Sequence, residues 1–289
     1  MRSTFANCIT NLAKDRSDIF LLSGDIGNRM FDDFKEIAPN RFINCGIAEG
    51  NMMSVAAGLA LSKFRPFVYT ITPFTTTRCL EQIKIGACYH NAPLVIVGTG
   101  SGLSYAELGP THHSLEDIAI LKALPNINIF TPSDSLELKS IIKETLDLDS
   151  PSYIRIGKKG EPNIYNNEKE FNFNKINWIK KGGDIAVISY GPIINEALQA
   201  AEDLTKDKIE ISVLSISKIR PFNFDLFDEL LSAGINHLII LEEHYSSSGL
   251  FNFIQVQTLQ RHLRFESIIP LGIPDEFIND LGKQKYLRK

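Results

Sequence analysis

The residues best suited to chemistry are a glutamate and two adjacent histidines. Glu49 stands at the start of a segment whose apolar side chains recur at helical spacing, and it shares their stripe, so its carboxyl group is expected to point inward. Burial disfavours the charged form of a carboxyl group, whereas the first turn of a helix favours it. An acid in a first turn is commonly no more than a partner of the helix dipole, so a functional Glu49 requires burial to prevail.

The histidines, His112 and His113, lie in a glycine-containing loop between Gly98 and Ser114. Imidazole titrates near neutral pH, so a histidine in a cleft loop suits proton transfer, and His112 is the catalytic candidate. Solvated or capping side chains are the alternative. Neither the histidine spacing nor a cysteine partner fits zinc, and we assign no metal ligand. The G-x-G-x-G spacing departs from the dinucleotide fingerprint, so we reject a Rossmann NAD site.

Two further segments place notable side chains just after an apolar run. The first holds Asp25, Ile26 and Arg29 in a loop that is also typical of an ordinary turn. The second places Phe74 where a strand is expected to end and a helix to begin, and a phenylalanine alone is usually part of the core.

A basic strand end, Arg155-Ile156-Gly157-Lys158-Lys159, is the last of these places. Its cations form either a solvated charge cluster or a contact for an anion such as phosphate. In open α/β sheets, ligands bind beyond the carboxyl ends of the strands, and all five places are expected there.

Apolar, β-branched runs alternate along the chain with segments of helical period. Runs this apolar on both faces favour a parallel sheet covered by helices, and the alternation predicts an open α/β fold. The expected strands are IFLLSGD, FVYTIT, LVIVGTG, INIFTPSD, SYIRIG, DIAVISYG, EISVLSIS and HLIILEE. The expected helices span residues 3–14, 49–62, 75–89, 134–147, 192–205 and 250–263.

The alternation breaks between Gly157 and Gly183, where the sequence is polar and rich in asparagine. This composition is typical of a linker. We therefore predict two consecutive open α/β domains with mostly parallel sheets, at residues 1–160 and 182–289, joined by a linker at 161–181.

Composition limits the possible partners. With 30 Lys and Arg against 34 Asp and Glu, the formal charge of -4 provides no global positive field for nucleic acid or an anionic membrane. No apolar run approaches the length of a membrane-spanning helix, and the N-terminal segment lacks the apolar core of a signal peptide. The four cysteines show no disulfide framework. We expect a cytoplasmic protein with no nucleic-acid or membrane partner.

Taken in order, these segments resemble the C-terminal half of transketolases, which are thiamine diphosphate enzymes, over nearly the whole chain. GIAEGNM with its Ala-rich helix resembles the glutamate segment of the family, FTTTRCLEQI the phenylalanine segment, GPTHH the histidine loop and PSYIRIGK the basic strand end. ILEEHYSSSGL and GIPDEF resemble the C-terminal domain. The resemblance implies a pyrimidine-binding domain followed by a transketolase C-terminal domain.

By the same resemblance, Glu49 hydrogen-bonds the aminopyrimidine ring nitrogen of the cofactor, and Phe74 stacks on that ring. Ile26 lies beneath the bent cofactor, and Asp25 lies near the thiazolium ring and the boundary between subunits. A carboxylic acid beside the ring nitrogen favours the imino tautomer, whose exocyclic nitrogen can accept the thiazolium proton, so Glu49 must share or donate a proton in a dry environment. The cofactor then acts as an electron sink while a carbon–carbon bond breaks.

The resemblance also implies roles toward the substrate. His112 is expected to move protons at substrate oxygen atoms. Arg29, Arg155 and Lys158 are expected to hold a phosphate or another anion, and Lys158 is the best placed of the three. The implied reaction is transfer of a two-carbon ketol unit between sugars, catalysed by a transferase.

Two alternatives share parts of this pattern. The same half-site is expected in the beta-type chain of a 2-oxo acid dehydrogenase and in a deoxyxylulose phosphate synthase relative, although the GPTHH loop and the FTTTR segment favour transketolase. A noncatalytic regulatory module that keeps the fold is the other alternative, and the presence of Glu49, Phe74 and His112 argues against it.

One departure from the family pattern implies a partner subunit. The Gly-Asp-Gly motif, which together with a later Asn anchors the diphosphate and Mg²⁺, is absent, because SGDIGN has Ile26 where the second glycine belongs. We expect an N-terminal transketolase subunit to bind the diphosphate and Mg²⁺. Two such heterodimers are expected to associate, because the site lies between domains of different chains.

Two other departures concern the substrate. Transketolases carry a histidine where this loop has Gly100 and an aspartate where it has Leu108. A lost hydrogen bond to a sugar hydroxyl is worth about 1 kcal/mol or more. We therefore expect a modified or nucleotide-linked sugar as readily as the usual pentose phosphates.

Overall fold

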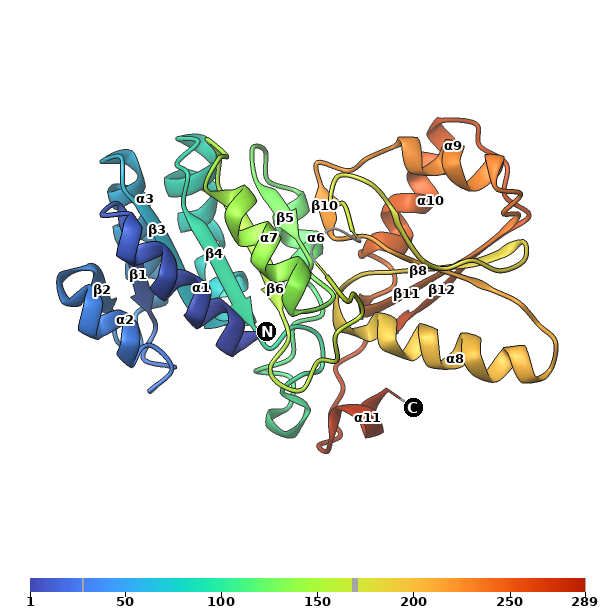
Figure 1. The fold of residues 1–289 in the computed structure, drawn as a ribbon, viewed down its shortest axis with the longest axis horizontal. Helices are drawn as coiled ribbons and strands as arrows, with labels where there is room; N and C mark the ends of the chain where they lie inside the picture. The colour runs from blue at the N-terminus through green and yellow to red at the C-terminus, as the bar shows by residue number, and fades with distance from the viewer. Residues whose placement is uncertain (28, 168–170, 289) are drawn as a thin grey trace.

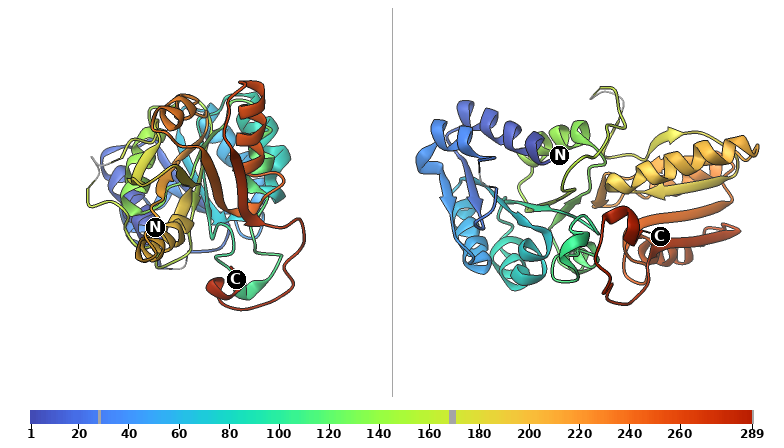
Figure 2. Two further views of the ribbon diagram at one scale, coloured as in Figure 1. Left: turned by 90° about the vertical axis from the view of Figure 1, so that its right-hand side faces the viewer. Right: turned by 90° about the horizontal axis from the view of Figure 1, so that it is seen from below.

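The computed structural model describes residues 1–27, 29–167 and 171–288. Two α/β units lie side by side, and each is built on a sheet with helices packed against both faces, as Figure 1 and Figure 2 show. The predicted fold class is confirmed.

The first sheet has seven strands in the order β10-β5-β6-β4-β3-β1-β2. Its neighbouring strands run parallel except β10, which is antiparallel to β5. The central strands are buried on both faces, as a parallel sheet between helices requires. The strands are β1 (Ile19–Ser23), β2 (Phe42–Asn44), β3 (Arg65–Ile71), β4 (Val95–Thr99), β5 (Asn128–Phe130), β6 (Ser152–Ile156) and β10 (Lys218–Arg220).

Two apolar layers cover this sheet. One contains side chains of helices α1 (Arg2–Asp15) and α7 (Ser135–Thr145), and the other contains side chains of α3 (Glu49–Leu61) and the π-helix η3 (Ile83–Tyr89). Asp134 caps α7 by accepting hydrogen bonds from two backbone N–H groups of its first turn. The shorter elements are α2 (Asp32–Ile37), η1 (Pro39–Arg41), α4 (Thr72–Thr75), η2 (Thr77–Cys79), α5 (Leu80–Gln82), η4 (Ala106–Leu108) and α6 (Asp117–Lys122).

The segment 75–89 is not the single helix that we predicted from the sequence. It divides into the end of α4, the short helices η2 and α5, and η3. The hydroxyl groups of Thr75 and Thr76 both donate to the carbonyl oxygen of Thr72, at 3.0 and 2.7 Å. Such back-bonding competes with the helical ladder and bends helices, and here it accompanies the break at Thr76. The break determines where the next side chains point.

The second sheet has five strands in the order β12-β11-β8-β9-β7, with β7 antiparallel to β9 and the rest parallel. Helix α8 covers one face, and α9 and α10 lie over the other (Figure 1). The strands are β7 (Asn177–Lys180), β8 (Ile185–Ser189), β9 (Ser212–Ser215), β11 (His237–Tyr245) and β12 (Ser267–Ile273). The helices are η5 (Gly191–Ile193), α8 (Ile194–Lys206), α9 (Asp225–Ser232), α10 (Leu250–Gln260) and α11 (Gln284–Leu287).

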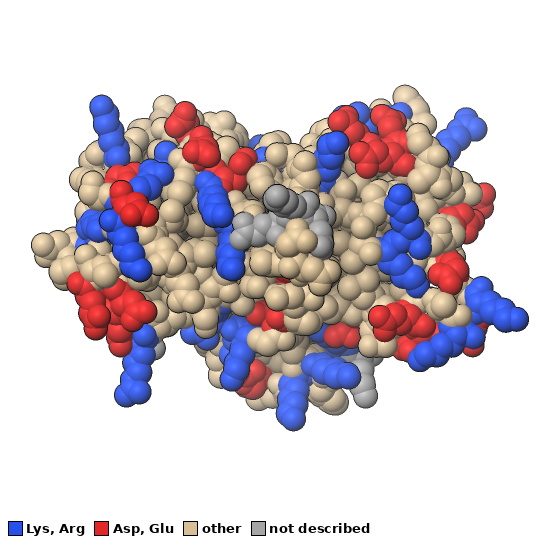
Figure 3. Space-filling view, in the orientation of Figure 1, with Lys and Arg blue, Asp and Glu red and all other residues tan. Residues whose placement is uncertain are grey.

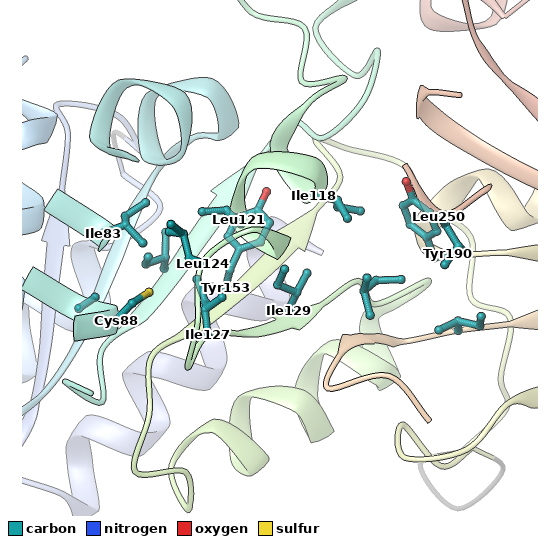
Figure 4. Close-up of a cluster of buried hydrophobic side chains, with 14 of the residues drawn as sticks. Ile83, Cys88, Ile118, Leu121, Leu124, Ile127, Ile129, Tyr153, Tyr190 and Leu250 are labelled. Carbon is teal, nitrogen blue, oxygen red and sulfur yellow. The ribbon is translucent and has the colours of Figure 1, made fainter. Parts of the chain in front are cut away.

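The two units share a continuous core. Figure 4 shows buried side chains that run from Cys88 and Leu121 of the first unit to Tyr190 and Leu250 of the second, all in one cluster. Strand β10 follows β9 in the chain but pairs with β5 of the first sheet. The relative position of the two units is therefore set by packing and by strand pairing.

The eight strands expected from the sequence are present, and β2, β7, β10 and β12 were not expected. No helix among the described residues is long and apolar enough to cross a membrane. Acidic and basic side chains are interspersed over both units on the face seen in Figure 3.

Candidate active site

The predicted site segments gather at one edge of the first sheet. Strands β1, β2, β3, β4 and β6 are parallel, so their carboxyl ends share that edge. This edge carries the loop after Ser23, the start of α3 and the short helix α4, together with the histidine loop after Thr99 and the basic segment after Ile156. It is the place where ligands bind in open α/β sheets.

Glu49 is the buried acid of this edge. Its side chain is 4% exposed, as the apolar stripe of α3 predicted. Oε2 accepts a hydrogen bond from Nη1 of Arg78 at 2.8 Å. A Cβ at Gly24 would lie 3.4 Å from Cγ of Glu49 and 3.2 Å from Oγ1 of Thr70, so the loop after β1 begins directly beside the acid.

Thr70 adds an unpartnered polar atom to this place. Its Oγ1 is buried and has no hydrogen-bond partner among the described residues. A buried hydroxyl without a partner is costly in a folded protein and calls for an explanation, such as a ligand or a water molecule.

Aromatic rings lie next to the acid. The guanidinium carbon of Arg78 lies 4.1 Å from the centroid of the Phe74 ring, a cation–π contact. The His112 ring meets Phe74 edge-on, with centroids 5.2 Å apart and an angle of 68°. Phe74 is half-buried, which leaves part of the ring open. The structure thus brings Glu49, Phe74 and His112 together, as expected.

His112 is arranged to be neutral near pH 7. Burial, with a smaller contribution from the positive charge of Arg78, lowers the pKa of His112 below its usual value. Nδ1 shares a hydrogen bond with the hydroxyl of Thr111 at 2.9 Å. A neutral imidazole of this kind can accept a proton from a hydroxyl group.

Lys158 lies on the other side of the histidine loop. Its ammonium group forms an ion pair with Glu107 and lies 4.2 Å from the centroid of the Tyr105 ring. Tyr105 in turn is 6.0 Å from His112, centroid to centroid. The hydrogen bond from Lys158 lowers the pKa of Glu107. A cation suited to an anionic substrate group is therefore near His112.

Arg155 lies away from this surface. It is 3% exposed, and its guanidinium group donates to Asp117 at 2.8 Å and to the carbonyl oxygens of Ser114 and Glu243 at 3.1 and 3.0 Å. These contacts join the histidine loop to strand β11 of the second unit. The structure does not bring Arg155 to the other site residues, and its predicted substrate contact stays a prediction.

The loop after β1 carries the remaining predicted residues. Asp25 is exposed, has a φ of 55° and accepts a hydrogen bond from Asn44 Nδ2 at 3.0 Å. Ile26 packs partly against the apolar layer of α1, and its carbonyl oxygen accepts from Ser23 Oγ at 2.7 Å. Arg29 is exposed. The cofactor and substrate roles of all three stay predictions.

Arg78 and Tyr105 received no role from the sequence. A buried acid needs a cation or hydrogen-bond donors, and that requirement was the available signal for a partner near Glu49. The four-residue spacing of Phe74 and Arg78 also suits a contact on a helix. The irregular turns of this segment hid which of its residues would supply the contact.

The described residues contain no group of three or more His, Cys, Asp or Glu side chains that could hold a metal ion. The donors near Glu49 fit an aminopyrimidine ring instead. A planar cation already lies on Phe74 and bonds the acid, which shows that this place accepts a flat, hydrogen-bonding group.

Comparison with known proteins identifies the class. Residues 1–161 match the transketolase pyrimidine binding domain, and residues 174–282 match the transketolase C-terminal domain. The chain therefore belongs to the transketolase family, whose members are transferases that use thiamine diphosphate.

The similar proteins include split enzymes. The chain is 34% identical to one of the two subunits of the apulose-4-phosphate transketolase of Phocaeicola vulgatus, over 95% of this chain and 88% of the relative. It is 31% identical to the 6-deoxy-6-sulfo-D-fructose transketolase subunit SqwH of Clostridium sp. (strain MSTE9), over 100% and 89%. It is also 32% identical to human transketolase, of which it covers 46%.

A solved split gene transketolase, an inactive beta4 tetramer, matches with a TM-score of 0.84 and 28% identity, over 95% of this chain and 89% of that chain. These findings favour transketolase over the 2-oxo acid dehydrogenase and deoxyxylulose phosphate synthase alternatives. The protein is a transketolase-type transferase subunit that corresponds to the C-terminal part of undivided transketolases.

Proposed function

We propose that this subunit supplies the aminopyrimidine half of a thiamine diphosphate site and that a separate N-terminal subunit supplies the diphosphate and Mg²⁺ half. The observation that carries the proposal is the buried Glu49 beside the half-open ring of Phe74. The matched domain families and the subunit names of the relatives support it.

Each residue of this half-site has a role in the proposal. Glu49 hydrogen-bonds the ring nitrogen of the aminopyrimidine and exchanges a proton there, while Phe74 stacks on the ring. Asp25 and Ile26 approach the cofactor from the loop after β1. Bound in this way, thiamine diphosphate supplies the electron sink that lets a carbon–carbon bond beside a carbonyl group break.

His112 and Lys158 are proposed to act on the sugar. The neutral imidazole of His112 accepts the proton of a substrate hydroxyl as the bond breaks and returns it to the acceptor. Lys158 exchanges Glu107 for a terminal anion of the substrate. The split relatives act, by name, on a sugar phosphate and on a sulfonated sugar, and both carry such an anion. Arg29 is proposed as a further anion contact.

The structure also bears on which sugar fits. Gly100 has a φ of 79°, and a Cβ there would collide with the ring of Tyr105. Tyr105 thus takes the space where transketolases carry a histidine, and Leu108, 47% exposed, takes the place of an aspartate. We propose a substrate with fewer hydroxyl groups on this side than the usual ketose phosphates have.

The division at residues 161 and 181 into two domains and a linker, the dimer of heterodimers and a cytoplasmic location belong to the same proposal. Cys45, Cys79 and Cys88 are free thiols, which suits a reducing compartment.

Reconstitution tests the proposal. The chain is mixed with a complementary N-terminal subunit, and thiamine diphosphate binding with Mg²⁺ is measured by calorimetry, together with ketol transfer from hydroxypyruvate, a three-carbon donor. We expect binding and transfer by the mixture and at most weak binding by either chain alone. Tight, Mg²⁺-dependent binding by this chain alone would contradict the division of the site between subunits.

A further inference from the structure

The side chain of Arg78 lies in the place proposed for the cofactor ring. Its guanidinium group bonds Oε2 of Glu49 at 2.8 Å and lies 4.1 Å from the centroid of the Phe74 ring. An aminopyrimidine ring has to make these same two contacts, a hydrogen bond to the acid and stacking on the phenylalanine. Both groups are flat and carry N–H donors at their edge, so one excludes the other.

We propose that Arg78 substitutes for the aminopyrimidine ring in the free subunit and has to swing out before thiamine diphosphate binds. The inference rests on the proposed function and adds a residue that gates the site. Arg78 holds the half-site closed while the subunit lacks cofactor, and it releases Glu49 when the cofactor arrives.

The closed arrangement protects a buried charge. Glu49 is 4% exposed, and a buried carboxylate without a partner is strongly destabilising. In a subunit whose cofactor is gripped by another chain, the acid would often lack its ligand. Arg78 supplies a counter-charge at those times, and Phe74 is covered as well.

The side chain is free to leave. Arg78 is 46% exposed, so the solvent can receive its guanidinium group without loss of hydration. It lies in η2, a three-residue helix next to the break at Thr76. The contacts found for its charged end are with Glu49 and Phe74, and neither involves the backbone. An exposed cation of this kind forms contacts that are individually weak.

The charges around Arg78 favour its movement once the site is filled. The nearby imidazole of His112 is destabilised in its protonated form by Arg78, so the two groups repel when His112 is charged. Glu107 lies beyond His112 and is paired with Lys158 in the free subunit. When a substrate anion takes over Lys158, Glu107 loses that partner and becomes an acceptor toward which Arg78 can turn.

The cost of displacing Arg78 reduces the apparent affinity for the cofactor. When only a fraction of the sites is open, the dissociation constant rises by the reciprocal of that fraction. A contact that keeps about nine sites in ten closed weakens binding about tenfold.

The test compares cofactor affinity in variants of the complete two-subunit assembly. Arg78→Met removes both contacts, and Arg78→Lys keeps the charge beside Glu49 but loses the flat group that stacks on Phe74. Lys84→Met is the matched control, because Lys84 is an exposed cation of the neighbouring η3. The dissociation constant of thiamine diphosphate is measured by calorimetry at fixed Mg²⁺, and the urea midpoint of each free subunit is measured in parallel.

We expect Arg78→Met to bind thiamine diphosphate about tenfold more tightly than the natural protein, Arg78→Lys to fall between them, and Lys84→Met to be unchanged. The urea midpoint of the free Arg78→Met subunit is expected to fall. Equal or weaker binding by Arg78→Met overturns the inference, and if that variant does not fold, the result with Arg78→Lys decides. Failure of the natural assembly to bind the cofactor contradicts the proposed function instead.

Discussion

The guanidinium group of Arg155 donates to the carboxylate of Asp117 at 2.8 Å, and the two side chains are only 3% and 1% exposed. The same carboxylate oxygen accepts a hydrogen bond from the hydroxyl of Tyr153 at 2.6 Å. Arg155 also reaches the carbonyl oxygens of Ser114 in the histidine loop and of Glu243 in the second unit. The pair therefore connects three parts of the fold at the base of the site.

Replacement of Arg155 by methionine tests whether this residue stabilises the fold or binds the substrate. The change leaves Asp117 buried without its cation, and breaking a buried pair costs about 3–5 kcal/mol. We expect the free energy of unfolding in urea to fall by that amount. Lys159→Met, which removes an exposed charge nearby, is expected to change it by less than about 0.5 kcal/mol. Unchanged stability with a raised KM would instead support a direct contact between Arg155 and the substrate.

Replacement of Glu49 by glutamine tests the acid. Glutamine keeps the shape of the side chain but cannot exchange the proton, so ketol transfer by the assembled enzyme is expected to fall by about 10²–10⁴-fold. The circular dichroism spectrum and the assembly are expected to stay as in the natural protein. Glu81→Gln, an exposed change in α5, is the control and should leave the rate unaltered. A normal rate in Glu49→Gln would discard the proposed proton exchange.

The protonation of His112 is a further measurable consequence. Because burial and Arg78 lower its pKa, the C2 proton of His112 is expected to titrate below the ordinary value of 6.5 in the free subunit. The titration is followed by nuclear magnetic resonance, with His113→Asn to separate the neighbouring signal. Removing the positive charge in Arg78→Met should raise the midpoint. A midpoint at or above 6.5 in the natural protein would mean that the imidazole is not held neutral.

Both the successes and the failures of the sequence-based prediction have physical causes. Strands such as β4 are apolar on both faces and were found without difficulty, and Glu49 was placed inside because it shares the stripe of α3. Strand β10 has three residues and pairs with a distant strand, so no local pattern announces it.

Arg155 and Arg78 show the same limit within the site. A basic residue at a strand end suggests an exposed anion contact, but β6 extends to Ile156 and buries Arg155 beside Asp117, a partner 38 positions away. The contact of Arg78 with Glu49 depends on the break at Thr76, which follows from hydroxyl hydrogen bonds rather than from apolar periodicity.

Glu137 predicts a pH dependence of stability. It is fully buried in α7, where its carboxylate accepts hydrogen bonds from the Ser133 N–H at 2.6 Å and the Ser217 hydroxyl at 2.7 Å, and burial raises its pKa from 4.5 to about 7. The folded state thus favours the protonated acid, so this contribution to stability is complete below pH 4.5 and is lost as the pH rises to about 7. The loss amounts to about 3 kcal/mol.

The measurement is urea unfolding of the natural protein and of Glu137→Gln between about pH 5 and pH 8, a window chosen around that pKa. Glutamine keeps the neutral form, so the stability of the variant relative to the natural protein is expected to increase with pH. Glu202→Gln, an exposed change on α8, should follow the natural protein. Parallel curves for Glu137→Gln and the natural protein would show that Glu137 is not protonated in the fold.

Replacement of Leu108 by aspartate restores the polar group that transketolases carry at this place and tests the proposed substrate. Leu108 is 47% exposed, so the change is expected to have little effect on stability. An added hydrogen bond to a sugar hydroxyl is worth about 1 kcal/mol, so kcat/KM for xylulose 5-phosphate should rise about fivefold. With hydroxypyruvate, a donor too short to reach the loop, the rate should stay constant. Leu108→Ala is the control for loss of the apolar side chain, and an equal gain in that variant would show that steric relief rather than hydrogen bonding governs the choice of sugar.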